Sequence, residues 1–153
     1  MQKLNLPTYH LKTREANDKL EVFDIIRKKY VLLTPEEWVR QQFVNFLINE
    51  KNYPASLIAI EKGIKVLKMS KRFDAVVSDQ KGYPVALIEF KSPEVNISQK
   101  VFEQIATYNM RLKVSHLIVS NGIKHYCCKV DYKKKKFTFL DDIPVYNDLT
   151  ESD

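Results

Sequence analysis

Two short segments near the middle of the chain, residues 72–77 and 84–91, are rich in β-branched and aromatic residues, the pattern of β-strands. The segment between them, residues 78–83, is polar and contains Gly82. A polar stretch with a glycine favours a turn. The pattern therefore predicts a β-hairpin whose two strands are largely apolar.

Charged residues interrupt this hairpin at one end. Side chains alternate between the two faces of a strand, so Glu89 and Lys91 share a face. Folding the hairpin about its turn brings Asp74 roughly opposite Glu89. Two carboxylates, with the backbone carbonyl of Phe90 between Glu89 and Lys91, are oxygen ligands of the kind that Mg²⁺ prefers. We therefore expect a Mg²⁺ site here, at which Mn²⁺ can substitute, with Lys91 beside an attacking water.

The N-terminal third of the chain gives one clear helix. Residues 1–19 are polar without a period, and we interpret them as an arm, either mobile or laid across the domain. Residues 20–33 fit a strand or a helical stripe, and the alternation at their start favours extended structure. Thr34 as the N-cap, Pro35 at the first helical position and Glu37 three residues after the cap predict the start of a helix.

The rest of the chain is predicted to contain further strands and a second helix. Residues 57–66 are a strand candidate that Glu-Lys-Gly interrupts, and a helix capped by an Asn or Ser is expected over residues 96–113. Residues 114–120 form a buried strand after that helix, which predicts a parallel crossover. Two further strands are expected at residues 123–130 and 137–140. The fold predicted is α/β, a mixed central β-sheet flanked by helices.

Length and composition agree with a single globular domain. The chain has 153 residues, of which 44% are hydrophobic and 29% charged. We place the domain at residues 20–147, between the arm and a frayed tail at residues 148–153. The start of the chain lacks a signal-peptide core, which predicts a cytoplasmic protein. Cys127 and Cys128 are adjacent, so they are poor disulfide partners.

The formal net charge of +6 permits a polyanionic partner. A lysine run at residues 133–136 fits an exposed turn between strands. Another basic group leads directly into Asp74, and we expect it to contact nucleic-acid phosphates. Its members are Lys65, Lys68, Lys71 and Arg72.

The Asp and Glu-x-Lys arrangement resembles the PD-(D/E)XK nuclease superfamily, although Phe73 stands where a proline usually precedes the aspartate. The longer context is similar to the N-terminal nuclease domain of type I restriction enzyme R subunits, in its small stand-alone form. The pieces that carry this resemblance are residues 34–41, residues 72–74, residues 88–93, Gln104 with Tyr108, and residues 120–122.

This resemblance implies metal-dependent hydrolysis of DNA phosphodiester bonds, with Asp74, Glu89 and Lys91 as catalytic residues. It also implies that Gln104 and Tyr108 support the site, although the same pair can simply anchor a helix to the sheet. An acidic residue on the preceding helix often completes the metal site in this superfamily. Glu37 is the first candidate and Glu36 the second, while capping of the helix is the other interpretation of Glu37.

Two functions of other classes remain open. One is a nucleic-acid-binding module on the same fold that does not cleave, and the other is an interaction domain in which the charged hairpin end is incidental. Retention of all three charged residues, Asp74, Glu89 and Lys91, favours the nuclease. The oligomeric state is also open, with a homodimer or a larger assembly among the alternatives.

Overall fold

A computed structural model describes residues 1–66, 69–109 and 113–150, with side chains described outside residues 62–72 and 107–109. The central element is a six-stranded sheet in the order β4-β5-β6-β7-β8-β9. Only β6 and β7 run parallel, and the other neighbours pair antiparallel. The strands are β4 Ile58–Val66, β5 Met69–Ser78, β6 Pro84–Phe90, β7 His116–Ser120, β8 His125–Asp131 and β9 Lys136–Leu140. The predicted mixed α/β fold and its parallel crossover are confirmed.

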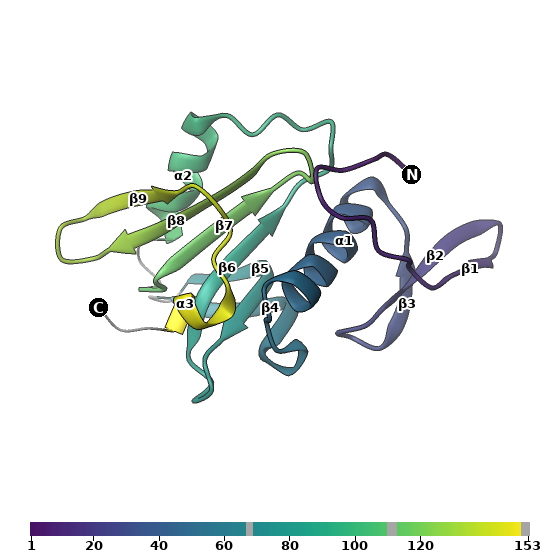
Figure 1. Cartoon of the computed structure of the whole chain (residues 1–153), viewed down its shortest axis with the longest axis horizontal. Coiled ribbons are helices and arrows are strands. Elements are labelled where there is room, and N and C mark those ends of the chain that lie inside the picture. The colour runs from purple at the N-terminus through teal and green to yellow at the C-terminus, as the bar shows by residue number, and fades with distance from the viewer. Residues whose placement is uncertain (67–68, 110–112, 151–153) are drawn as a thin grey trace.

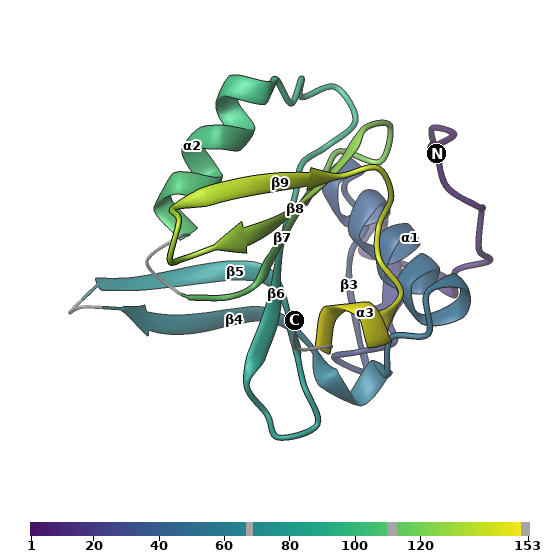
Figure 2. The same cartoon turned by 60° about the vertical axis from the view of Figure 1, so that its left-hand side comes forward.

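Two helices cover opposite faces of this sheet (Figures 1 and 2). Helix α1, Pro35–Glu50, packs Phe43 and Leu47 into one core cluster with Ala75 and Ile88. Helix α2, Gln99–Asn109, packs Phe102 and Ala106 into a second cluster with Val76, Leu87 and Val119. The two cysteines contribute to different clusters, as alternation along a strand predicts.

Residues 20–33 are extended on either side of a turn at residues 25–28, as the alternation favoured. They belong to a separate three-stranded antiparallel sheet made of β1 Thr13–Ala16, β2 Lys19–Asp24 and β3 Lys29–Leu32. Helix α1 lies between this small sheet and the six-stranded sheet (Figure 1). The arm is laid across the domain: Leu4 is buried, and the Asn5 N–H donates to the Gly122 carbonyl over 2.8 Å.

Gly122 permits this docking of the arm. Its φ is +86°, and a Cβ atom at this position would lie 2.7 Å from the Leu4 Cδ2 atom. A larger residue would meet both backbone strain and a steric clash. The N-terminal residues therefore pack against a turn that follows β7 at the end of the main sheet.

The expected fraying of the C-terminal tail is wrong for residues 148–150. Helix α3, Tyr146–Thr150, buries Tyr146 and Leu149 in the core cluster that contains α1. The Tyr146 hydroxyl also donates to the Ser78 carbonyl over 2.9 Å. Burial of Tyr146 and Leu149 therefore holds this polar segment against the core. Residues 151–153 lie outside the described residues. A short 3-10 helix, Ala55–Leu57, connects α1 to β4.

Candidate active site

Strands β5 and β6 stop pairing at the predicted charged end of the hairpin. Their last paired residues are Ala75 and Ile88, so Asp74 and Glu89 occupy the next position on each strand. Beyond this point β5 continues to pair with β4, and β6 continues to pair with β7 as far as Phe90. The two strands therefore diverge where the two carboxylates lie, as Figure 2 shows in the different directions that β5 and β6 take.

Asp74 is fixed at this divergence by a hydrogen bond. Its Oδ2 atom accepts the backbone N–H of Phe90 over 2.7 Å, in place of a strand carbonyl. The carboxylate is half-buried and its orientation is set by this contact. Its second oxygen, Oδ1, is the one that remains for another ligand.

Glu89 and Lys91 lie on either side of Phe90. Glu89 is half-buried, and its Oε1 atom is shielded from solvent. Lys91 follows the end of β6, where its backbone N–H donates to the Ser120 carbonyl over 2.9 Å. This contact extends the alignment of β6 with β7 by one residue, so the Lys91 backbone is held to the sheet.

Glu36, at the start of α1, lies within electrostatic range of this group. Burial raises the pKa of the Glu36 carboxyl above its usual value, and the charge of Asp74 raises it further. Arg40 and Lys91 act in the opposite direction on the same pKa. Three residues from different elements, Glu36, Asp74 and Lys91, therefore share one electrostatic environment.

Glu37 is bound instead to two arginines. Its Oε1 atom lies 3.2 Å from Arg27 Nη2, and its Oε2 atom lies 2.8 Å from Arg40 Nε. Its backbone N–H donates to the Thr34 hydroxyl over 3.0 Å, which confirms the predicted cap. Because both carboxylate oxygens of Glu37 already have cationic partners, Glu37 is less suited than Glu36 to add a carboxylate to this group.

The other residues expected at the site belong to other parts of the chain. Gln104 is exposed on α2, and Tyr108 belongs to the same helix, although its side chain lies outside the described residues. Lys65, Lys71 and Arg72 belong to the paired strands β4 and β5, at one edge of the six-stranded sheet. Their side chains and the whole of Lys68 likewise fall outside the described residues, so the predicted phosphate contacts stay a prediction.

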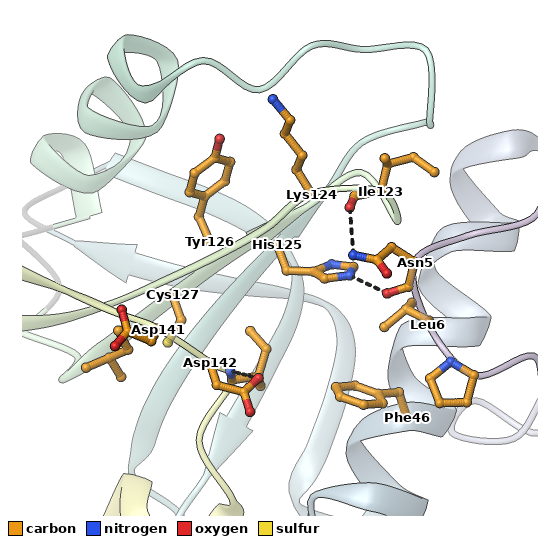
Figure 3. A pocket seen from close by; sticks show the side chains of 13 residues that line it. Asn5, Leu6, Phe46, Ile123, Lys124, His125, Tyr126, Cys127, Asp141 and Asp142 are labelled. Atoms are coloured by element: carbon orange, nitrogen blue, oxygen red, sulfur yellow. Dashed lines mark hydrogen bonds between the residues drawn. The ribbon is translucent and has the colours of Figure 1, made fainter.

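A cavity of about 520 Å³ lies elsewhere, between the arm and β8 (Figure 3). His125 points into it and uses both ring nitrogens: Nδ1 lies 2.7 Å from the Ser120 hydroxyl, and Nε2 lies 2.9 Å from the Asn5 carbonyl. Burial lowers the pKa of His125, although the Asn5 carbonyl and Asp142 act against this shift. The imidazole therefore holds the arm in place, and this cavity does not reach the carboxylates of β5 and β6.

The donor set at the divergence fits a hard cation with an incomplete protein shell. Asp74, Glu89 and the Phe90 carbonyl offer oxygen atoms, and Mg²⁺ commonly takes one or two carboxylates and keeps several waters. Among the described residues, no group of three or more His, Cys, Asp or Glu side chains is arranged to hold a metal. A cation bound here would thus rely on two carboxylates, a carbonyl and water.

Comparison with known proteins indicates the family and the fold of this chain. The family described as the type I restriction enzyme R protein N terminus matches residues 35–144. A solved fragment of a protein assigned as an HsdR subunit of a type I restriction enzyme from Vibrio vulnificus is similar in structure, with a TM-score of 0.54 and 20% sequence identity. The similarity covers 76% of this chain and only 24% of that one. No curated protein matches the sequence.

No helix of the described residues has the length and apolar character that a membrane span requires.

Proposed function

The chain belongs to the family of type I restriction enzyme R protein N-terminal domains, and we propose that it is a Mg²⁺-dependent nuclease that hydrolyses DNA phosphodiester bonds. The observation that carries this proposal is the placement of Asp74 and Glu89 where β5 and β6 diverge, with Lys91 next to them. Apolar strands seldom carry such a group, and its oxygen donors match the ligand preference of Mg²⁺.

Each residue of the group has a separate task. Asp74 and Glu89 bind the cation, and the Asp74–Phe90 hydrogen bond orients the first of these carboxylates before a cation arrives. The chemistry that the cation supplies is activation of water and neutralisation of charge on the phosphate. Lys91 donates hydrogen bonds to the attacking water or to a phosphate oxygen, because a protonated lysine has donors and no acceptor.

Glu36 contributes negative charge on the α1 side of the group. Its electrostatic coupling to Asp74 and Lys91 supports a position from which Glu36 would add negative charge near the bound cation. Glu37 supports the group indirectly, by binding Arg27 and Arg40. The division of labour between these adjacent residues follows from their different partners.

The deciding experiment is cleavage of plasmid and of single-stranded DNA by the purified protein. Mg²⁺ and Mn²⁺ are each supplied, a chelator serves as the control, and Asp74→Ala is purified in parallel to detect a contaminating nuclease. We expect metal-dependent nicking or degradation by the wild type only. If the wild type binds DNA and cuts neither substrate with either metal, the protein is a non-cleaving nucleic-acid-binding module.

A further inference from the structure

Glu61 has an unfavourable backbone conformation in the middle of β4. Its φ is +54°, in the left-handed region that non-glycine residues rarely adopt. Within the described residues, the other non-glycine residues with positive φ lie in turns or in loops. Such a conformation persists where the surrounding structure compels it, and it is common near functional sites.

The register places Glu61 directly opposite Asp74. Ile60 pairs with Ala75 on one side of this position, and Lys62 pairs with Phe73 on the other. The unfavourable residue on β4 is thus the neighbour across the sheet of the carboxylate that we assign to the cation.

The face alternation of β5 changes at the same position. Ala75 and Val77 pack in the core cluster that contains α1, whereas Phe73 packs with Val76 in the cluster that contains α2. In an uninterrupted strand, Phe73 and Ala75 would lie on the same face. The hairpin therefore rotates at Asp74, and local irregularities of this kind re-aim a side chain.

Two arginines, one half-buried and one buried, hold the Glu61 side chain. Arg27 Nη1 lies 3.1 Å from Glu61 Oε2, and Arg40 Nη1 lies 3.6 Å from Glu61 Oε1. The same two arginines bind the two oxygens of Glu37, so the four side chains form a closed ring of ion pairs. The Arg27 and Arg40 side chains are only 17% and 9% exposed. The Glu61 side chain is 36% exposed, so these ion pairs are partly buried, and we expect them to contribute more to a defined arrangement than to net stability.

This ring joins three parts of the molecule. Arg27 comes from the turn between β2 and β3, where its Nε atom also lies 2.7 Å from Asp24 Oδ2. Glu37 and Arg40 come from the first turns of α1, and Glu61 comes from β4. Arg27 precedes the residues that match the family, so the small sheet adds a contact from outside the matched segment.

We infer that Glu61, held by Arg27 and Arg40, is a positioning residue that keeps Asp74 in hydrogen-bond contact with the Phe90 N–H. Glu61 acts on Asp74 through the backbone of the neighbouring strand and touches neither the cation nor the DNA. The catalytic consequence of this role rests on the proposed nuclease function, whereas the structural consequence does not.

Amide hydrogen exchange of Phe90 tests the inference directly. Glu61→Gln removes the charge and nearly preserves the size of the side chain, and Glu103→Gln is the matched control on an exposed face of α2. We expect Phe90 to exchange up to about tenfold faster in Glu61→Gln, which is the change that weakening of one intramolecular hydrogen bond produces. The amide of Ile118, in the centre of the sheet, should exchange at the wild-type rate.

Glu61→Gly distinguishes the effect of the ion pairs from the effect of the backbone conformation. Glycine adopts a positive φ without strain but offers no carboxylate. If Phe90 exchanges faster in this variant than in the wild type, the ion pairs of Glu61 position Asp74. If Phe90 exchanges at the wild-type rate, the inference is wrong. Unchanged exchange in Glu61→Gln, or equal acceleration at Ile118, also overturns the inference, since the role would then be absent or global.

The activity of the same variants provides a second readout. We expect Glu61→Gln to lower kcat by about 10- to 100-fold with little change in KM for DNA, and Glu103→Gln to leave both unchanged. A change in KM alone would contradict a positioning role. If the wild type cleaves no DNA, the proposed function fails, and the exchange rates of Phe90 still decide the role of Glu61.

Discussion

The Asp74 carboxylate accepts a 2.7 Å hydrogen bond from the Phe90 backbone N–H, at the point where β5 and β6 separate. This single contact links the two strands that carry the proposed ligands. It satisfies a backbone donor that the ladder no longer satisfies, and it orients the carboxylate. Asp74 therefore has both a structural and a proposed catalytic role, and suitable substitutions separate them.

Asp74→Asn should preserve the structural role and lose the catalytic one. The amide oxygen of Asn can accept the Phe90 N–H but carries no charge, whereas Asp74→Ala loses both properties. We expect Asp74→Ala to lower the free energy of unfolding by about 1–3 kcal/mol, since a buried donor loses its partner, and Asp74→Asn to lower it less. Both variants should lose Mn²⁺ binding in calorimetry.

The control for this comparison is Asp18→Asn, at an exposed turn with positive φ, where Asn is well tolerated. It removes the same charge far from β6 in the sequence. Mn²⁺ binding that persists in Asp74→Asn at the wild-type affinity would place the cation on other residues.

Glu36 and Glu37 should respond oppositely to neutralisation. Glu36→Gln should leave the free energy of unfolding unchanged or raise it, because burial and Asp74 both disfavour the charge of Glu36. Glu37→Gln should lower it, by as much as about 3 kcal/mol, because Arg27 and Arg40 lose a buried partner. We expect Glu36→Gln to lose cleavage despite this stability.

Urea denaturation and DNA cleavage, measured on the same two preparations, check this contrast. A Glu36→Gln variant that cuts DNA at the wild-type rate would remove Glu36 from the site. A Glu37→Gln variant as stable as the wild type would show that the ion pairs to the arginines contribute no net stability.

Nucleic-acid affinity should depend on the basic group that leads into Asp74. Each phosphate contact contributes a slope of about −0.9 to log affinity against log salt for duplex DNA. Reversal of Lys65, Lys68 and Lys71 to Glu should weaken binding and flatten that slope. The matched control reverses three lysines at and beside the β8–β9 turn, Lys133, Lys134 and Lys136, and should have a smaller effect. If both variants lose the same DNA affinity, binding depends on net charge and not on the basic group that leads into Asp74.

His125 should make stability depend on pH. Its pKa in the folded protein lies below the unfolded value of 6.5, chiefly because the imidazole is buried. The unfolded state therefore binds the proton first, and the free energy of unfolding falls as the pH decreases below about 6.5, by at most about 1.4 kcal/mol per pH unit. His125→Gln should remove this dependence, since its amide can donate to the Asn5 carbonyl without titrating.

Urea titrations at several pH values between 5 and 7.5 check the difference between wild type and His125→Gln, and the exposed His10→Gln serves as the control. The difference isolates His125 from the carboxylates, which titrate in both proteins. A difference that does not change with pH would mean that His125 titrates alike in the folded and unfolded states.

The sequence predicted the elements whose pattern is local. The strands of the hairpin, the Thr34 cap and the parallel crossover before β7 all follow from alternation, capping residues and connection length, and the structure confirms them. The roughly opposed Asp74 and Glu89 also follow from the turn. These features need only neighbours within a few tens of residues.

Features that depend on distant partners were not predictable in the same way. Glu36 and Glu37 are adjacent, and one of the two arginines that bind Glu37, Arg27, comes from the small sheet. The sequence 61–63 marked an irregularity in β4 with a glycine, and the structure assigns a positive φ to Glu61. The buried tail was missed because Leu149 finds its partners in a core built from residues far back in the chain.

Substitution of Lys91 distinguishes catalysis from binding. Lys91 is half-buried at the end of β6, and its backbone contact to Ser120 does not depend on the side chain. Its proposed donors act on the attacking water and on charge that develops in the transition state, and such interactions lower the barrier with little effect on ground-state binding. Lys91→Ala should therefore keep the fold, Mn²⁺ binding and most DNA affinity, and lower the cleavage rate by about 10²- to 10³-fold.

Lys100→Ala, at the exposed start of α2, is the control and should cut like the wild type. If Lys91→Ala also cuts like the wild type, Lys91 has no catalytic role; if it loses DNA affinity in the same proportion as rate, its role is to bind the phosphate.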